Sequence, residues 1–236
     1  RLLFITGAGI SADSGLPTYR GVGGLYDDAD TEDGMPIEEA LSGRMFRRRP
    51  ELTWRHILDI ERACRGARPN RGHEVIAALE ATHDVTVLTQ NVDGLHLKAG
   101  STQLIDIHGD IHHLTCPACG WHKTVQDYAG LPDLPTCPSC DAVIRPEVVL
   151  FGEMLDENKL RALQSGMAKG YDVVFSIGTS SLFPYIAMPV VECGRHGALT
   201  VEINPSETEV THVVRHKIRT GAADALGALY DIMQNT

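Results

Sequence analysis

The chain has 236 residues, of which 43% are hydrophobic, and its formal net charge at pH 7 is −10. This length and apolar content suit one large domain with an inserted module, or two small domains, around a real hydrophobic core. The acidic balance argues against direct nucleic-acid binding, which needs a net basic face, but it tolerates a lysine-rich protein partner.

Five short aliphatic runs predict strands that are buried on both faces of a sheet. They cover residues 2–6, 84–89, 104–107, 172–177 and 198–203. Helical patterns alternate with these runs, and the clearest lie at residues 72–81, 158–169 and 222–233. Alternating strands and helices predict an α/β fold with a Rossmann-like, doubly wound parallel sheet.

Two stretches interrupt this alternation and predict a small inserted lobe. Residues 27–70 carry helical patterns, and residues 111–147 hold four cysteines with little regular pattern. We interpret the first stretch as a helical module and the second as a zinc-binding module. The nucleotide-binding, Rossmann-like domain would then comprise residues 1–26, 71–110 and 148–236.

A glycine loop directly follows the first predicted strand. Gly7, Gly9 and Ala12 fit the pattern Gly-x-Gly-x-x-(Gly/Ala), whose small residues let the backbone approach a pyrophosphate. The alternative is a plain tight turn. A dehydrogenase would place an acidic residue at the end of its second strand, about 20 residues later. Here that distance falls in a glycine-rich loop, 21–24, so the pattern predicts dinucleotide binding without the usual hydride-transfer arrangement.

Polar clusters follow four of the predicted strands at their carboxyl ends, where open α/β sheets bind ligands. These clusters are 89–93, 108–110, 178–180 and Asn204. A single cluster of this kind is usually turn chemistry, but four at the edge that carries the glycine loop favour a site. His108 is the natural proton acceptor there, because the pKa of imidazole is close to neutral.

Two Cys-Pro-x-Cys turns, seventeen residues apart, predict one structural zinc ion. Their thiols belong to Cys116, Cys119, Cys137 and Cys140. Gly120 and Asp141 suit the tight knuckle that follows each turn. Disulfides and buried free thiols are the alternatives. Zinc ribbons occur in enzymes, DNA-binding proteins and interaction modules, so the metal alone does not indicate a function.

The remaining features bear on location. Only Cys64 and Cys193 lie outside the paired motif. Such a small number of additional cysteines is more typical of a reducing compartment than of a secreted, disulfide-rich protein. No apolar run approaches the ~20 residues that a membrane span needs, and no signal peptide is recognisable. We therefore expect a cytoplasmic protein without a membrane partner. Residues 2–6 already look like a strand, so we expect that further residues precede them.

Taken together, the motifs resemble the sirtuin family of NAD-dependent protein lysine deacylases over nearly the whole chain. In chain order they are Gly7-Ala8-Gly9-Ile10-Ser11, Ser14-Gly15-Leu16-Pro17-Thr18-Tyr19-Arg20-Gly21, Thr89-Gln90-Asn91-Val92-Asp93-Gly94-Leu95-His96, His108-Gly109, the two cysteine pairs, Arg145-Pro146-Glu147-Val148-Val149-Leu150-Phe151-Gly152-Glu153, Gly178-Thr179-Ser180 and Ile203-Asn204.

The resemblance implies a bacterial-type deacetylase that uses NAD as co-substrate and transfers the acyl group of an acyl-lysine protein or peptide to ADP-ribose. The acyl-lysine carbonyl oxygen would displace nicotinamide and give an imidate at the ribose. His108 would then act as general base on a ribose hydroxyl, so that the imidate is attacked internally before hydrolysis releases lysine and O-acyl-ADP-ribose. The zinc would be structural, because four thiolates leave no open coordination position.

The resemblance also implies roles for individual residues. His108 and Asn91 would be catalytic, with Asn91 and Asp93 lining the nicotinamide pocket. The expected NAD contacts are Gly7, Ala8, Gly9, Ser11, Asp13, Tyr19, Arg20, Gln90, Asn91, Val92, Asp93, Gly178, Thr179, Ser180, Asn204 and Ala222. Substrate peptide would add as a strand beside Val148, Phe151, Gly152 and Glu153.

Two positions depart from the family pattern. Tyr19 stands where the family usually has Phe, at a position that covers the reactive ribose, and its hydroxyl would change the access of water. Sirtuins that remove succinyl or malonyl groups carry a Tyr-x-x-Arg pair, and here Ile57 and Ile60 align with it. An apolar pocket cannot stabilise a carboxylate, so we predict deacetylation, extending to longer apolar acyl groups. Arg55 and Arg62 lie nearby and leave a shifted register open.

Two other functions compete with this interpretation. NAD-dependent mono-ADP-ribosyl transfer would share the cofactor site and differ in the acceptor. A non-catalytic zinc-ribbon interaction or nucleic-acid module would carry only a degenerate nucleotide fold. The joint presence of His108, Asn91 and Asp93 argues against the second of these.

Overall fold

The computed structural model describes residues 1–18 and 34–235, and its largest element is a six-stranded parallel sheet. The predicted Tyr19 and Arg20 contacts lie outside the described residues. The sheet order is β3-β2-β1-β7-β8-β9, so the chain moves outward from β1 in both directions. Its strands are β1 (Leu2–Thr6), β2 (Val85–Thr89), β3 (Leu104–Asp106), β7 (Val173–Ile177), β8 (Leu199–Ile203) and β9 (His216–Ile218). The predicted doubly wound fold is confirmed.

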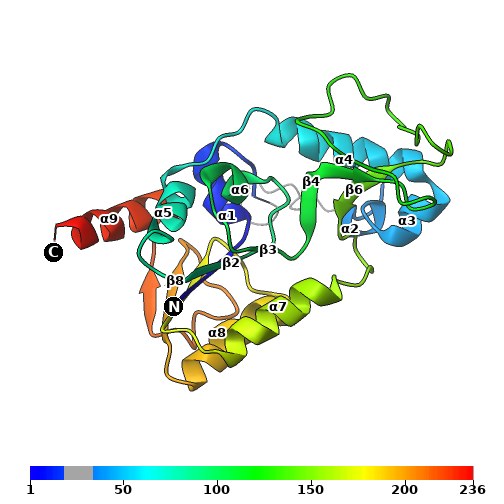
Figure 1. The fold of residues 1–236 in the computed structure, drawn as a ribbon. Coiled ribbons are helices and arrows are strands. Elements are labelled where there is room, and N and C mark those ends of the chain that lie inside the picture. Colours follow the sequence, from blue (N-terminus) through cyan, green and yellow to red (C-terminus); the bar gives the residue numbers. More distant parts are fainter. Residues whose placement is uncertain (19–33, 236) are drawn as a thin grey trace.

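Helices cover both faces of this sheet because its strands are apolar on both faces (Figure 1). Phe4 packs in one core with residues of α5 (Arg71–Leu79) and α9 (Ala222–Gln234). Leu3 and Ile5 point to the opposite face and pack with residues of α7 (Glu157–Ala168) and α8 (Pro184–Arg195). Each fully buried aliphatic side chain of this kind contributes about 1.5–3 kcal/mol to folding.

A second, smaller layer lies beyond the sheet and is built by segments from two parts of the chain (Figure 1). The first part contributes three helices: α2 (Ile37–Ala40), α3 (Gly43–Arg48) and α4 (Pro50–Cys64). The second contributes an antiparallel sheet in the order β5-β4-β6, formed by β4 (Gly109–Thr115), β5 (His122–Thr124) and β6 (Arg145–Val148). The fully buried Trp54 joins the two parts, since its indole nitrogen donates to the Ile144 carbonyl at 2.7 Å.

Several elements differ from the sequence prediction. The expected lack of regular structure in 111–147 is wrong in part, because β5 lies within that stretch and β4 and β6 overlap its ends. Helix α8 was missed because Pro184 and Pro189 obscure its pattern; Pro184 stands at the first helical position and Pro189 within the helix. Strand β9 was missed because its three residues, His216–Ile218, include two polar side chains.

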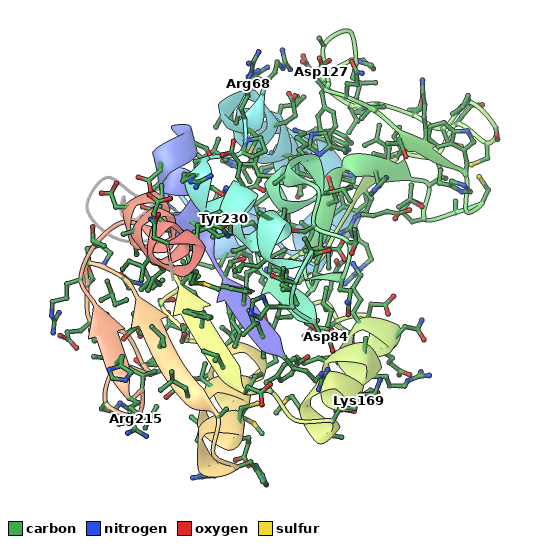
Figure 2. All side chains as sticks on the ribbon, turned by 60° about the vertical axis from the view of Figure 1, so that its left-hand side comes forward. Arg68, Asp84, Asp127, Lys169, Arg215 and Tyr230 are labelled. Carbon is green, nitrogen blue, oxygen red and sulfur yellow. The ribbon has the colours of Figure 1, made fainter. Side chains whose placement is uncertain are left out.

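Three short elements complete the fold: α1 (Ala8–Ser11), the 3-10 helix η1 (Ala12–Ser14) and α6 (Leu95–Ala99). Charged side chains such as Arg68, Lys169 and Arg215 point outward into solvent (Figure 2). Among the described residues, none of the helices combines the length and apolar character that crossing a bilayer demands.

Candidate active site

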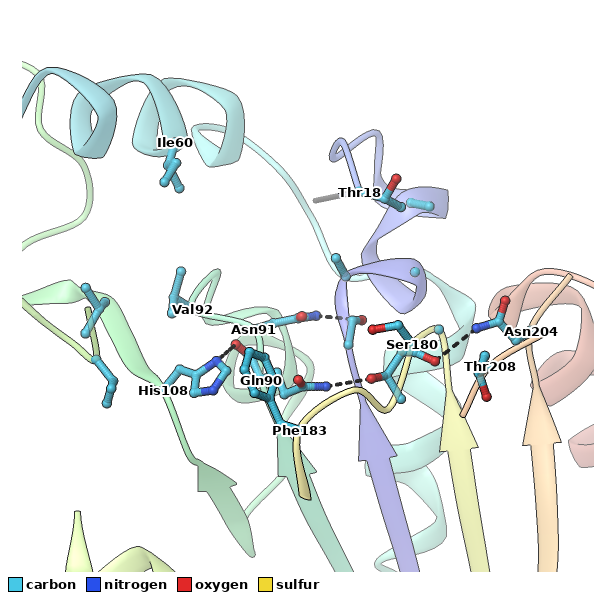
Figure 3. Close-up of a pocket in the computed structure, with 18 of the residues that line it drawn as sticks. Thr18, Ile60, Gln90, Asn91, Val92, His108, Ser180, Phe183, Asn204 and Thr208 are labelled. Carbon is cyan, nitrogen blue, oxygen red and sulfur yellow. Dashed lines mark hydrogen bonds between the residues drawn. The ribbon is translucent and has the colours of Figure 1, made fainter. Parts of the chain in front are cut away.

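A cavity of about 890 Å³ opens at the carboxyl ends of the parallel strands, and the smaller layer forms part of its wall. This is the edge at which open α/β sheets bind ligands, and the volume lies in the range of ligand pockets. The four polar clusters that follow the strands meet here, as predicted. Figure 3 shows Gln90, His108, Ser180 and Asn204 around this space.

The glycine loop forms one side of the cavity because its backbone packs directly against the turn after β7. Gly9 N donates to Gly178 O at 2.8 Å, and a Cβ on Gly9 would lie 2.6 Å from Gly178 Cα. Backbone on both sides leaves no side chain that could move away, so larger residues are excluded at this position. Asp13 ties the loop to α9, since Ala223 N donates to its carboxylate at 3.1 Å. The chain thus presents two adjacent stretches of bare backbone to the cavity.

Side-chain amides connect the polar clusters to one another (Figure 3). Gln90 Nε2 donates to Thr179 Oγ1 at 2.7 Å, and Asn91 Nδ2 donates to Gly7 O at 3.1 Å. Asn204 Nδ2 donates to Thr179 O at 3.2 Å. These bonds fix four strand ends in a common frame, so that the cavity is shaped before any ligand enters.

His108 lies between β3 and β4, with both ring nitrogens engaged. Nδ1 lies 2.9 Å from Gln90 O, and Nε2 lies 2.7 Å from the hydroxyl of Tyr185. A carbonyl oxygen can only accept, so Nδ1 carries the hydrogen and Nε2 of the neutral ring keeps its lone pair. Burial lowers the pKa of His108 and outweighs the hydrogen bond to Gln90 O, which acts in the opposite direction; the positive charge of Lys159 adds to the lowering. His108 is therefore neutral at pH 7, which is the form that can accept a proton.

Asp93 and Ser11 lie behind the cavity wall and line a smaller neighbouring pocket. Ser11 Oγ donates to the Asp93 carboxylate at 2.7 Å, and Leu95 N donates to it at 2.9 Å. Asn91 Nδ2 also lies 3.2 Å from Ser11 Oγ. Burial raises the pKa of Asp93 in spite of these two bonds. Asp93 thus lies beside Asn91, which lines both pockets, and its contact with nicotinamide stays a prediction.

Part of the cavity wall is apolar. It includes Ile57 and Ile60 from α4 and Val148 from β6. Arg55 and Arg62 are exposed, which removes the shifted register from consideration: isoleucine side chains, not arginines, face the cavity. Both isoleucines, Ile57 and Ile60, belong to the apolar stripe that the spacing of residues in α4 predicts.

The segment after β6 is held by an ion pair at the cavity rim. The guanidinium of Arg145 donates to both carboxylate oxygens of Glu153, at 2.6 and 2.9 Å. This paired arginine lowers the pKa of Glu153, although burial acts in the opposite direction. Phe151 N donates to Leu41 O at 3.0 Å, so the segment is anchored to the helical part of the smaller layer.

Nearly all of the predicted site residues within the described ranges line this one cavity. They are Gly7, Ala8, Gly9, Asp13, Ile57, Ile60, Gln90, Asn91, Val92, His108, Val148, Phe151, Gly152, Glu153, Gly178, Thr179, Ser180, Asn204 and Ala222. The sequence did not suggest Phe183 and Tyr185, which also line it. The aromatic pair after the 178–180 turn was the available signal, but an apolar or aromatic residue there is more often part of a core.

The four motif cysteines form a separate cluster at the far side of the smaller layer, and their geometry suits a metal ion. All four sulfurs lie within 4.8 Å of one another, and the Cys116–Cys140 and Cys119–Cys137 sulfur pairs are each 3.6 Å apart. The edge of a ZnS₄ tetrahedron with Zn–S bonds of about 2.3 Å is about 3.8 Å, whereas a disulfide needs about 2.05 Å.

The knuckles that hold these sulfurs form as the sequence predicts. Gly120 N donates to Cys116 O, and Asp141 N donates to Cys137 O, each at 2.9 Å. Gly120 and Asp141 adopt φ values of 73° and 60°, the left-handed conformation that closes each turn. The donor set of four thiolates fits a closed, structural zinc site.

Comparisons with known proteins agree with one another. The model of the Sir2 family matches residues 7–183. A protein of Pseudomonas syringae pv. tomato named NAD-dependent protein deacylase 2 is 51% identical over 213 residues, which are 89% of this chain and 86% of that protein. A protein of the same name from Pseudomonas aeruginosa is 47% identical over 96% of this chain and 90% of its own length.

Solved structures extend the similarity to the whole fold. A mutant Sir2 homologue in complex with ADP ribose superposes with a TM-score of 0.89 at 32% identity, covering 99% of this chain and 92% of that one. A Sir2 complex with a p53 peptide and NAD⁺ gives a TM-score of 0.84 at 28% identity, covering 100% of this chain and 94% of that one.

Proposed function

This chain belongs to the Sir2 family, and on that basis we propose that it is an NAD-dependent protein lysine deacylase that removes acetyl groups. The observation that supports this most directly is His108, a neutral imidazole whose Nε2 keeps its lone pair beside the cavity at the strand ends. This chain covers 86% and 90% of the length of the two Pseudomonas relatives that carry the deacylase name.

The cavity fits a dinucleotide. The bare backbone around Gly9 and Gly178 can approach a pyrophosphate, and the amides of Gln90 and Asn204 lie on either side of it. When bound there, NAD supplies an electrophilic ribose carbon with nicotinamide as its leaving group. The Sir2 homologues in complex with ADP ribose and with NAD support this placement.

The residues of the chain then have distinct tasks. The apolar wall at Ile57, Ile60 and Val148 would desolvate the acyl-lysine and guide its carbonyl oxygen toward the ribose. Asn91, fixed by Gly7 O, would orient the nicotinamide end of the cavity. His108 would take the proton of a ribose hydroxyl on Nε2. The resulting products are free lysine, nicotinamide and O-acyl-ADP-ribose, with water consumed.

Peptide substrates would enter along the rim that the Arg145–Glu153 pair stabilises. Residue 152 and its neighbours lie beside the cavity mouth and offer backbone groups to an added strand. A Sir2 relative has been solved with a p53 peptide, which supports a protein substrate.

We retain the division into a Rossmann-like domain and an inserted lobe, with the lobe sheet beginning at Gly109. The free thiols of Cys64 and Cys193 fit a cytoplasmic location.

Incubation with an acetyl-lysine peptide and NAD tests the proposed function. We expect nicotinamide release that depends on both reactants, measured by chromatography, with one deacetylated peptide formed per nicotinamide. NAD labelled in its adenosine part separates the competing reaction: label in soluble O-acetyl-ADP-ribose supports deacetylation, and label on protein supports ADP-ribosyl transfer. An absence of NAD-dependent turnover would contradict the proposal.

Acyl selectivity follows from the apolar wall. We expect kcat/KM for a succinyl-lysine peptide to be at least about 100-fold below that for the acetyl-lysine peptide, because an unpaired carboxylate in an apolar pocket costs several kcal/mol. The nearby Arg145 cannot serve as partner, since Glu153 already holds it at 2.6 Å. A butyryl-lysine peptide is the matched control: it is similar in length and uncharged, and should be turned over. Efficient desuccinylation would disprove this assignment of the wall.

A further inference from the structure

We propose that Tyr185 is a positioning residue for His108: its hydroxyl holds Nε2 and stabilises the ring in the protonated state that the reaction creates. The inference rests on the proposed function, because it assigns a partner to the proposed general base. None of the sequence motifs includes Tyr185, and its place beside His108 becomes visible only in the folded chain.

Tyr185 reaches His108 because α8 begins beside the cavity. Pro184 occupies the first helical position, so Tyr185 stands in the first turn. Its ring stacks on Phe183, with centroids 5.4 Å apart and an interplanar angle of 12°. The imidazole of His108 stands nearly perpendicular to both rings, at 80° to Tyr185 and 89° to Phe183. Three rings thus support one another, and the tyrosine ring is held in a fixed orientation.

The contact of Nδ1 determines which partner donates in the hydrogen bond between Tyr185 and Nε2. Gln90 O accepts from Nδ1, so Nε2 of the neutral ring is an acceptor and the Tyr185 hydroxyl must donate across the 2.7 Å contact. After His108 takes up a proton, Nε2 becomes a donor and the same hydroxyl oxygen can accept. Because Nε2 has a single lone pair, the Tyr185 hydroxyl must turn its hydrogen aside when the ribose hydroxyl approaches, and its oxygen can accept from Nε2 once the proton has been transferred.

The hydrogen bond to Tyr185 stabilises the protonated form of His108 more than the neutral form. Hydrogen bonds with an ionised member are roughly twice as strong as those between neutral groups, so the imidazolium gains more from Tyr185 than the neutral ring does. The other charges around His108 do not replace it. Lys159 of α7 opposes the imidazolium and is itself paired with Asp106 at 2.8 Å, and Asp110 of β4 is paired with His112 at 2.6 Å.

The substitution Tyr185→Phe keeps the ring stack and removes only the hydroxyl. We expect the acid limb of the kcat/KM profile to move toward lower pH by about one unit, because the imidazolium loses more than the neutral ring. We expect the plateau to fall by about tenfold, because the proton that His108 accepts is less stabilised. Tyr171→Phe is the matched control: that hydroxyl lies at the opposite ends of the strands, and its loss should leave the profile unchanged.

Titration of the His108 ring by NMR in the ligand-free protein gives a second measurement that needs no turnover. We expect a pKa in Tyr185→Phe below that of the wild type, and nitrogen shifts in the wild type that show hydrogen on Nδ1. An equal or higher pKa in the variant, or an unmoved acid limb, would overturn the role of Tyr185. If the variant does not fold, a wild-type ring with hydrogen on Nε2 would still overturn it. Wild-type protein that fails to deacetylate would instead contradict the proposed function.

Discussion

Replacing His108 by alanine is expected to lower NAD-dependent deacetylation by about 10²–10⁴-fold, the usual contribution of a positioned general base. The loss should be chemical and not structural. The imidazole is only partly buried and makes two hydrogen bonds, to Gln90 O and to the Tyr185 hydroxyl. Circular dichroism and the unfolding midpoint should therefore stay close to those of the wild type, while product formation falls.

The pH dependence gives the same residue a second test. Burial lowers the pKa of His108 below its ordinary value near 6.5, and only the neutral ring can take a proton. Activity that depends on this ring should thus be maintained at pH 7 and lost as the pH falls through the lowered pKa, on the acid side of 6.5. His83→Ala is the control, since it removes an exposed histidine in the turn between α5 and β2. A fully active His108→Ala enzyme would show that another group is the base.

The sequence predicted those parts of the site that depend on short segments. The glycine loop and the polar strand ends need only a strand followed by a turn, and parallel pairing then places them at one edge, as in the register of Leu2 with Val85 and Val173. Contacts between distant segments could not be read in the same way. Tyr185 meets His108 across 77 positions, and no local pattern encodes that contact.

The strand pairing of the smaller layer could not be predicted from the sequence either. Strands β4 and β6 pair through Gly109 and Val148, and a shift in register between Asp110 and Leu114 interrupts the ladder. Alternation of side chains is blurred where register shifts, so residues 111–147 gave little regular pattern. The metal site in the same stretch could nevertheless be predicted, because the spacing of its ligands depends on turns of four residues and not on the pairing of strands.

Removing the metal should unfold the smaller layer and abolish activity without touching the sheet that carries the glycine loop. Cys116 and Cys137 are buried in the same apolar cluster as Trp54 and Ile57. Structural zinc contributes on the order of 10 kcal/mol to the folding of small zinc modules, comparable to the whole stability of a typical domain. That core cannot be expected to persist without the ion, and the cavity would lose the wall that Ile57 and Ile60 provide.

Tryptophan fluorescence can follow this event selectively, because both tryptophans of the chain, Trp54 and Trp121, pack in that cluster. Treatment with a strong chelator should red-shift their emission and abolish deacetylation, and added Zn²⁺ should restore both. Cys137→Ser should behave like the chelated wild type. Cys64→Ser, which removes a thiol of α4 outside the metal cluster, should bind zinc and remain active. Protein shown by metal analysis to be free of zinc, yet active and unshifted in emission, would contradict a supporting role for the ion.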